Sequence, residues 1–93
     1  MSLYLKDPDG IVSYAIDWGS AYLGDLAIAA SAWGVSPDEE GGVQILSTSH
    51  DFGRTAASVG GGRAGRVYRL ANRVTLSDGS VDERSLVVRV EQR

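Results

Sequence analysis

Hydrophobic and polar residues alternate along much of the chain, and the alternation has a period of two rather than the 3.6 of a helix. The clearest run is IVSYAIDW, in which Val12, Tyr14, Ile16 and Trp18 are separated by small or polar residues. Because side chains two apart lie on the same face of a strand, this run predicts a half-buried β-strand with Trp18 in the core.

The last third of the chain predicts two longer strands joined by a tight turn. Their inward positions are apolar or aromatic: Tyr68, Leu70, Val74 and Leu76 on one strand and Leu86, Val88 and Val90 on the other. Between them, SDGS carries the Asp-Gly pair that two-residue hairpin loops favour. The sequence therefore predicts a hairpin whose outward positions include Arg69, Arg73 and Arg89.

Three shorter strands are expected in the middle of the chain. Residues 25–33, DLAIAASAW, are rich in alanine, but the run is short and ends in turn-forming residues, so we predict a strand. The runs GVQILSTSH and RTAASVG flank HDFG, whose Asp and Gly favour a tight turn, and predict a second hairpin. We interpret GGGRAG, residues 60–65, as a flexible hinge before the strand that starts at residue 66.

Strands of this number and spacing predict an all-β fold, an immunoglobulin-like antiparallel β-sandwich of six to seven strands, with a small barrel as the alternative. Tyr68 favours the sandwich, because a tyrosine near the start of the penultimate strand can form the tyrosine corner, in which its hydroxyl bonds upstream backbone. With 93 residues, we expect a single domain covering residues 1–93.

Composition narrows the classes of partner. The formal net charge is −3, which offers no bulk attraction for nucleic acid. No stretch approaches the roughly 20 apolar residues of a membrane span, and no secretory signal is recognisable at the start, so we expect no membrane and residence in a cytoplasm. The chain has no cysteine, which excludes disulfides, thiolate chemistry and cysteine-bound zinc.

Candidate catalytic and ligand-binding residues are few. His50 is the only histidine, and although Ser47, Ser49 and Asp51 are nearby, no nucleophile motif of the G-x-S-x-G kind is present. We therefore predict a solvated turn residue and no enzyme. KDPDG resembles only the opening of a calcium loop, and GGGRAG precedes a strand rather than the helix that a phosphate cradle needs. We expect neither a metal nor a cofactor.

The candidate interaction surface comprises Arg69, Arg73 and Arg89 on the outward faces of two neighbouring strands, together with Trp33. Two interpretations of the arginines stay open: a protein-binding ridge, or a solvated face on which they pair with acidic neighbours such as Glu91. Trp33 is either a core residue or an exposed anchor for a partner.

Three segments carry a resemblance that covers nearly the whole chain: KDPDGIVSYAIDW, IAASAWGV and GGRAGRVYRLANRVTLSDGSVDERSLVVRV. In the last segment, the positions with the most specific spacing are Gly65, Tyr68, Asn72, Asp78, Gly79, Arg84, Ser85 and Leu86. The chain resembles a family of short structural proteins of tailed bacteriophages and prophages. The resemblance implies an immunoglobulin-like sandwich that serves as a virion or assembly component, without a catalytic site to carry over.

The resulting hypothesis is a virion structural or assembly protein at the head–tail junction, in the tail or on the capsid surface. It would act by contact with other virion proteins, or with itself as a homo-oligomer, in the virion or in the host cytoplasm when expressed from a prophage. The rival hypothesis is a carbohydrate-binding or adhesin-type module that uses Trp33 or Tyr22 as a stacking platform.

Overall fold

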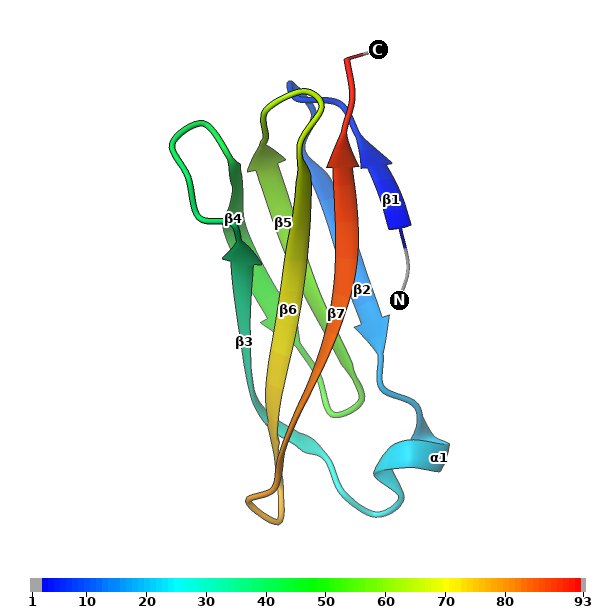
Figure 1. The fold of residues 1–93 in the computed structure, drawn as a ribbon. Helices are drawn as coiled ribbons and strands as arrows, with labels where there is room; N and C mark the ends of the chain where they lie inside the picture. Colours follow the sequence, from blue (N-terminus) through cyan, green and yellow to red (C-terminus); the bar gives the residue numbers. More distant parts are fainter. Residues whose placement is uncertain (1–2, 93) are drawn as a thin grey trace.

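Two β-sheets face each other in the computed structural model, which describes residues 3–92 (Figure 1). These residues form the strands β1 (Leu3–Lys6), β2 (Val12–Asp17), β3 (Ile28–Ser36), β4 (Val43–His50), β5 (Arg54–Gly61), β6 (Val67–Leu76) and β7 (Val81–Val90), and the helix α1 (Ser20–Leu23). One sheet has the strand order β1-β7-β6-β3, and the other has the order β2-β5-β4. The predicted all-β sandwich is confirmed.

The alternation in β6 and β7 builds the centre of the four-stranded sheet. Tyr68 lies opposite Val88 and Leu70 opposite Leu86 in the antiparallel register, and all four side chains are buried. Their sequence neighbours face outward, as a period of two requires. The core therefore lies between the two sheets, and the outer faces are left for contacts with other molecules.

Asn72 lies between two hydrophobic clusters of the core. One cluster includes Tyr68 and Leu70, and the other includes Trp18 and Val74. The side-chain oxygen of Asn72 accepts hydrogen bonds from Trp18 Nε1 at 3.1 Å and from Thr55 Oγ1 at 2.6 Å. Its amide nitrogen donates to Ser31 Oγ and to the Ala32 carbonyl, so this buried polar group connects both sheets. Trp18 is 1% exposed, which confirms its predicted place in the core.

The predicted tyrosine corner is confirmed at Tyr68. Its hydroxyl accepts a hydrogen bond from the backbone N–H of Arg63 at 3.1 Å and donates to Glu39 Oε1 at 2.7 Å. These bonds hold the start of β6 against its own upstream loop and against the loop between β3 and β4. Burial raises the pKa of the Tyr68 hydroxyl.

β1 was not foreseen from the sequence, and it is the exception to the antiparallel pattern. It pairs parallel with β7, with Leu3 beside Val87 and Lys6 beside Val90. The side chain of Lys6 is 1% exposed, and its ammonium donates to the Gly61 carbonyl at 2.6 Å and to the Asp7 carbonyl at 2.8 Å. Burial lowers the pKa of this ammonium.

The region between β2 and β3 also differs from the prediction. The short helix α1 follows β2, and the expected strand over residues 25–33 instead begins at Ile28 and continues to Ser36. No helix within residues 3–92 has the length and hydrophobicity needed to cross a membrane.

The predicted flexible hinge at residues 60–65 is wrong, because its backbone is held by specific hydrogen bonds. Gly60 and Gly61 still belong to β5. The N–H of Gly62 donates to the Gly41 carbonyl at 3.2 Å, and the N–H of Gly65 donates to the Val90 carbonyl at 2.7 Å. Gly61, Gly62 and Gly65 have positive φ, a backbone conformation that glycine adopts without steric cost.

Candidate functional site

The three predicted arginines lie on the outer face of the four-stranded sheet. Arg69 and Arg73 project from β6 and Arg89 from β7, and all are exposed. In the register of the two strands, Arg69 lies opposite Val87 and Arg89 opposite Val67, so the two arginines are diagonal neighbours. Arg73 lies four residues along β6 from Arg69, a separation of about 13 Å. The structure thus brings the arginines together on one surface.

Apolar side chains surround the arginines on this surface. Leu3 is 64% exposed, Leu5 49% and Val67 50%, and β1 places Leu5 directly beside Arg89. We call the outward side chains of Leu3, Leu5, Val67, Arg69, Arg73, Val87 and Arg89 the arginine face. Arginine next to apolar side chains is a composition common in protein–protein interfaces. The sequence signal for the apolar part was weak, because LYLK, residues 3–6, is too short to show a period.

The charges of the arginine face are only partly compensated. Arg89 Nε lies 2.9 Å from Glu91 Oε1, an exposed pair that contributes about 0–1 kcal/mol to stability. Arg69 Nε donates to Ser85 Oγ at 3.1 Å, and Arg73 faces Glu83 across the strand pair. Within residues 3–92, neither Arg69 nor Arg73 takes part in an ion pair. These two guanidinium groups are therefore available to a partner's carboxylates.

Trp33 lies on the opposite side of the same sheet. It pairs with the inward-facing Asn72, is half-buried, and packs against the core cluster that contains Tyr14 and Val59. Its indole N–H is buried and makes no hydrogen bond within residues 3–92. The structure does not bring Trp33 together with the arginines. The Trp33 side chain packs against the core on the inner side of β3.

A cluster of aromatic and charged side chains fixes α1 to β7. The guanidinium of Arg84 lies 4.3 Å from the ring centroid of Trp18 and 5.0 Å from that of Tyr22. The Tyr22 hydroxyl donates to Asp82, which raises the pKa of Tyr22 and lowers the pKa of Asp82. The hydroxyl of Tyr22 is therefore bonded to Asp82, and its ring is in contact with the guanidinium of Arg84. These contacts within the protein do not favour Tyr22 as a stacking platform for a sugar.

The residues around His50 do not assemble a catalytic triad. His50 ends β4, and Asp51 Oδ1 accepts hydrogen bonds from the N–H groups of Gly53 and Arg54 at 2.9 Å each. These bonds lower the pKa of Asp51 and hold its carboxylate in the turn, and within residues 3–92 no hydrogen bond joins it to the imidazole as a triad requires.

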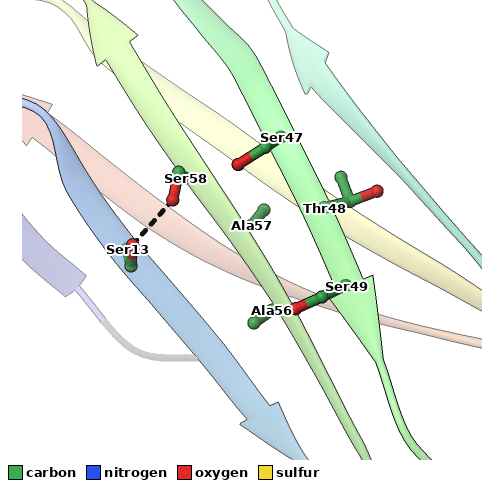
Figure 2. A pocket seen from close by; sticks show the side chains of 7 residues that line it. All are labelled: Ser13, Ser47, Thr48, Ser49, Ala56, Ala57 and Ser58. Carbon is green, nitrogen blue, oxygen red and sulfur yellow. Dashed lines mark hydrogen bonds between the residues drawn. The ribbon is translucent and has the colours of Figure 1, made fainter.

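A shallow groove on the outer face of the three-stranded sheet is lined by small side chains (Figure 2). Its volume is about 130 Å³, and Ser13, Ser47, Thr48, Ser49, Ala56, Ala57 and Ser58 line it. The hydroxyls of Ser13 and Ser58 are 2.7 Å apart and bond each other. Since these lining residues include no acid or base, the groove offers hydroxyls without a group to activate them.

In the acidic turn before β2, Asp7 accepts hydrogen bonds from backbone N–H groups of the same turn. Asp7 Oδ1 accepts the N–H of Asp9 at 2.8 Å, and the Asp7 carbonyl accepts the N–H of Gly10 at 3.1 Å. Within the described residues, no group of three or more acidic or histidine side chains is placed to hold a metal ion. KDPDG therefore forms a turn, as predicted.

Comparison with known protein families gives one identification. Residues 6–89 match the family Gp77, described as podophage GP4 fiber-tail adaptor protein gp77. The match covers most of the chain, including β2 to β6 and nearly all of β7. Among curated proteins, none matches the chain at a significant level.

Proposed function

Because this chain belongs to the family of the podophage GP4 fiber-tail adaptor protein gp77, and is therefore a virion structural protein of a bacteriophage, we propose that it joins a fiber protein to the tail. Of the locations considered from the sequence, the family description supports the tail. An adaptor works by binding other virion proteins, so its functional sites are surfaces rather than reacting groups.

We propose that the arginine face is one of these surfaces. The observation that carries the proposal is the exposed apolar group of Leu3, Leu5 and Val67 directly beside Arg69 and Arg89. Burial of the apolar groups would supply binding energy, and the guanidinium forks would select a partner with carboxylates at matching positions. We place Trp33 outside the proposed contact, because its side chain packs against the core cluster on the inner side of β3.

Reconstitution with the fiber and tail proteins of the same phage tests the proposal. We expect the purified chain to form a ternary complex with both proteins in size-exclusion chromatography. Val67→Asp and Arg69→Ala should each weaken the binding of one of the two proteins by about tenfold or more. Gln44→Asp is the matched control, because it adds the same charge as Val67→Asp to an exposed strand position on the other sheet.

Two results would contradict the proposal. If the wild-type chain binds neither the fiber nor the tail protein, it is not their adaptor. If Val67→Asp binds both proteins as tightly as Gln44→Asp does, the arginine face is not the contact. Self-association through the same face is a further arrangement, and sedimentation of the wild-type chain alone measures it.

A further inference from the structure

The helix α1 and the turn that joins β4 to β5 lie toward the same end of the sandwich (Figure 1). A cleft is lined by residues of both segments. Its volume is about 440 Å³, within the range of sites that bind small ligands or side chains. Leu23 is 5% exposed and belongs to the core cluster that contains Trp18 and Val74. Leu26 is half-buried and packs against the same cluster. Together with the backbone of Gly19 and Gly53, they give the cleft an apolar floor.

Phe52 stands at the edge of this cleft and is held outward. Its side chain is 76% exposed, the largest exposed fraction among the bulky apolar residues of the described chain. Its carbonyl accepts the N–H of Ile28 at 2.9 Å, and the carbonyl of Gly53 accepts the N–H of Trp18 at 3.0 Å. These two bonds hold the backbone of the turn that joins β4 to β5 against the end of β2 and the start of β3, and so fix the place of Phe52 at the cleft edge. An aromatic side chain on a held backbone has only two rotatable torsions, so it loses little conformational freedom on binding, which is a property of interface anchors.

The edge of the cleft is acidic. Asp17 lines it, Asp25 lies between the lining residues Gly24 and Leu26, and Asp51 directly precedes Phe52. Two guanidinium groups adjoin these lining residues: that of Arg54 lies 3.8 Å from the Asp17 carboxylate in an exposed pair, and that of Arg84 donates to the Asp17 carbonyl at 3.5 Å. The three carboxylates outnumber the two guanidinium groups, which leaves a local charge of −1. The cleft therefore combines an apolar floor with an edge that attracts cations.

We propose that this cleft docks a protein segment that inserts a leucine-sized side chain flanked by lysine or arginine. Burial against Leu23, Leu26 and Phe52 would supply the affinity, and the carboxylates of Asp17 and Asp25 would select the flanking cations. The inference rests on the proposed function in one respect. An adaptor needs two contact surfaces, and this cleft lies at an end of the molecule, apart from the arginine face.

Titration of the ¹⁵N-labelled chain with short peptides tests the cleft directly. The probe is acetyl-Gly-Lys-Leu-Lys-Gly-amide, and we expect saturable shifts of the amide signals of Gly19, Gly24, Leu26 and Gly53. A peptide with Glu in place of both Lys residues, and one with Ser in place of Leu, should each bind about tenfold more weakly.

Two variants of the chain sharpen the test. Phe52→Ala should weaken binding of the Lys-Leu-Lys peptide by about tenfold without unfolding the protein, since the ring is largely exposed. Ile11→Ala is the matched control, because Ile11 is 72% exposed and precedes the far end of β2. It should leave peptide binding unchanged. Asp25→Asn should weaken binding and reduce its dependence on salt.

The outcomes separate this proposal from the adaptor proposal. Absence of saturable shifts at about 10 mM peptide, or equal binding of all three peptides, would overturn the cleft as a docking site. If the peptide binds as expected while neither the fiber nor the tail protein binds the chain, the adaptor function fails and the cleft stands. If both virion proteins bind and Phe52→Ala changes neither binding nor peptide shifts, the cleft alone fails.

Discussion

The buried amide of Asn72 couples the two sheets through a single side chain. An asparagine amide offers two donor hydrogens and an acceptor oxygen with two lone pairs. Here the oxygen accepts from Trp18 and Thr55, and the nitrogen donates to Ser31 and Ala32. Because all of this capacity is used, the polar group is compatible with full burial.

Replacing Asn72 should be among the most destabilising single changes. Asn72→Ala would leave the N–H of Trp18 and the hydroxyl of Thr55 buried without partners, and we expect the free energy of unfolding to fall by about 3 kcal/mol. Urea denaturation followed by tryptophan fluorescence measures the change. Arg73→Ala, one residue along β6 but facing outward, should change it by less than about 0.5 kcal/mol. A loss below about 1 kcal/mol at Asn72 would contradict this account.

Gly62 and Gly65 form a matched pair for testing the held loop before β6. Both have positive φ, at 110° and 82°. A Cβ on Gly62 would also lie 2.6 Å from Val90 Cγ2, whereas a Cβ on Gly65 would meet nothing within 4 Å. We expect Gly65→Ala to cost about 1 kcal/mol from backbone strain and Gly62→Ala about 3 kcal/mol, since overpacking is added. Thermal or urea unfolding measures both, and equal costs would show that the loop relaxes freely.

At the scale of elements, the sequence predicted the strands whose alternation is long. β2, β6 and β7 follow from a period of two, because one face of each is buried against the other sheet. β1 and α1 were missed for a physical reason. Each has four residues, too few to show a period, and β1 exists because β7, far along the chain, supplies its partner.

The candidate site was predictable to a similar degree. Strand parity placed Arg69, Arg73 and Arg89 on one outer face, whereas Trp33 could not be placed without the pairing of β3 with β6. Asn72 stands at an inward position of β6, and a polar residue in that pattern signals a buried network. The exposure of Phe52 could not be predicted from HDFG. Asp51 and Gly53 indicate a turn, but they do not determine whether the aromatic ring between them is exposed.

β1 should open before the rest of the sandwich. Three of its four side chains are exposed, and its anchor is the buried Lys6. We therefore expect the amides of β1, and that of Glu91, which donates to the Lys6 carbonyl, to exchange with solvent faster than the amides between β6 and β7. Native-state hydrogen exchange by NMR measures these rates.

Lys6→Met tests the anchor itself. Loss of the ammonium's hydrogen bonds to the Gly61 and Asp7 carbonyls should speed exchange in β1 about tenfold further. Leu5→Met, at an outward position of the same strand, is the control and should leave exchange nearly unchanged. Uniform exchange across both strand pairs in the wild-type protein would show that β1 is not a separate unit.

At the scale of the whole molecule, the structure separates two kinds of surface. The described chain is elongated, with extents of 43 × 21 × 18 Å. The arginine face lies on the outer side of the four-stranded sheet, and the acidic cleft lies beside α1. Figure 1 shows α1 at one end of the molecule. Two partners can therefore contact the protein at the same time without competing for the same residues.

Stability of the whole molecule should fall in alkaline solution. Burial raises the pKa of Tyr14 and Tyr68, and the hydrogen bond to Asp82 raises that of Tyr22, above the ordinary value of 10.0. Between pH 10 and the folded pKa values, the unfolded chain loses these protons and the folded chain keeps them. The tyrosine contribution is thus complete below pH 10 and is lost as the pH rises through the folded values.

The lowered pKa of Lys6 has the opposite effect on stability, at pH values below 10.5. Burial lowers its pKa from 10.5, so stability rises with pH between the folded value and 10.5. Above that pH, Lys6 is neutral in both states and the tyrosines act alone. Urea denaturation at a series of pH values should show the decline, and Tyr22→Phe should make it shallower. A decline of unchanged slope in Tyr22→Phe would contradict the assigned cause.

The parallel pairing of β1 with β7 has a mechanical consequence. The two strands run in the same direction, so tension between Leu3 and Glu91 pulls them in opposite senses along their common axis (Figure 1). Such a load slides one strand past the other, and the evenly spaced hydrogen bonds of a parallel pair share it in shear. Tension across the open end of a hairpin would instead peel the bonds apart one after another. The strand that we expect to open first by thermal fluctuation is thus arranged to resist a directed pull.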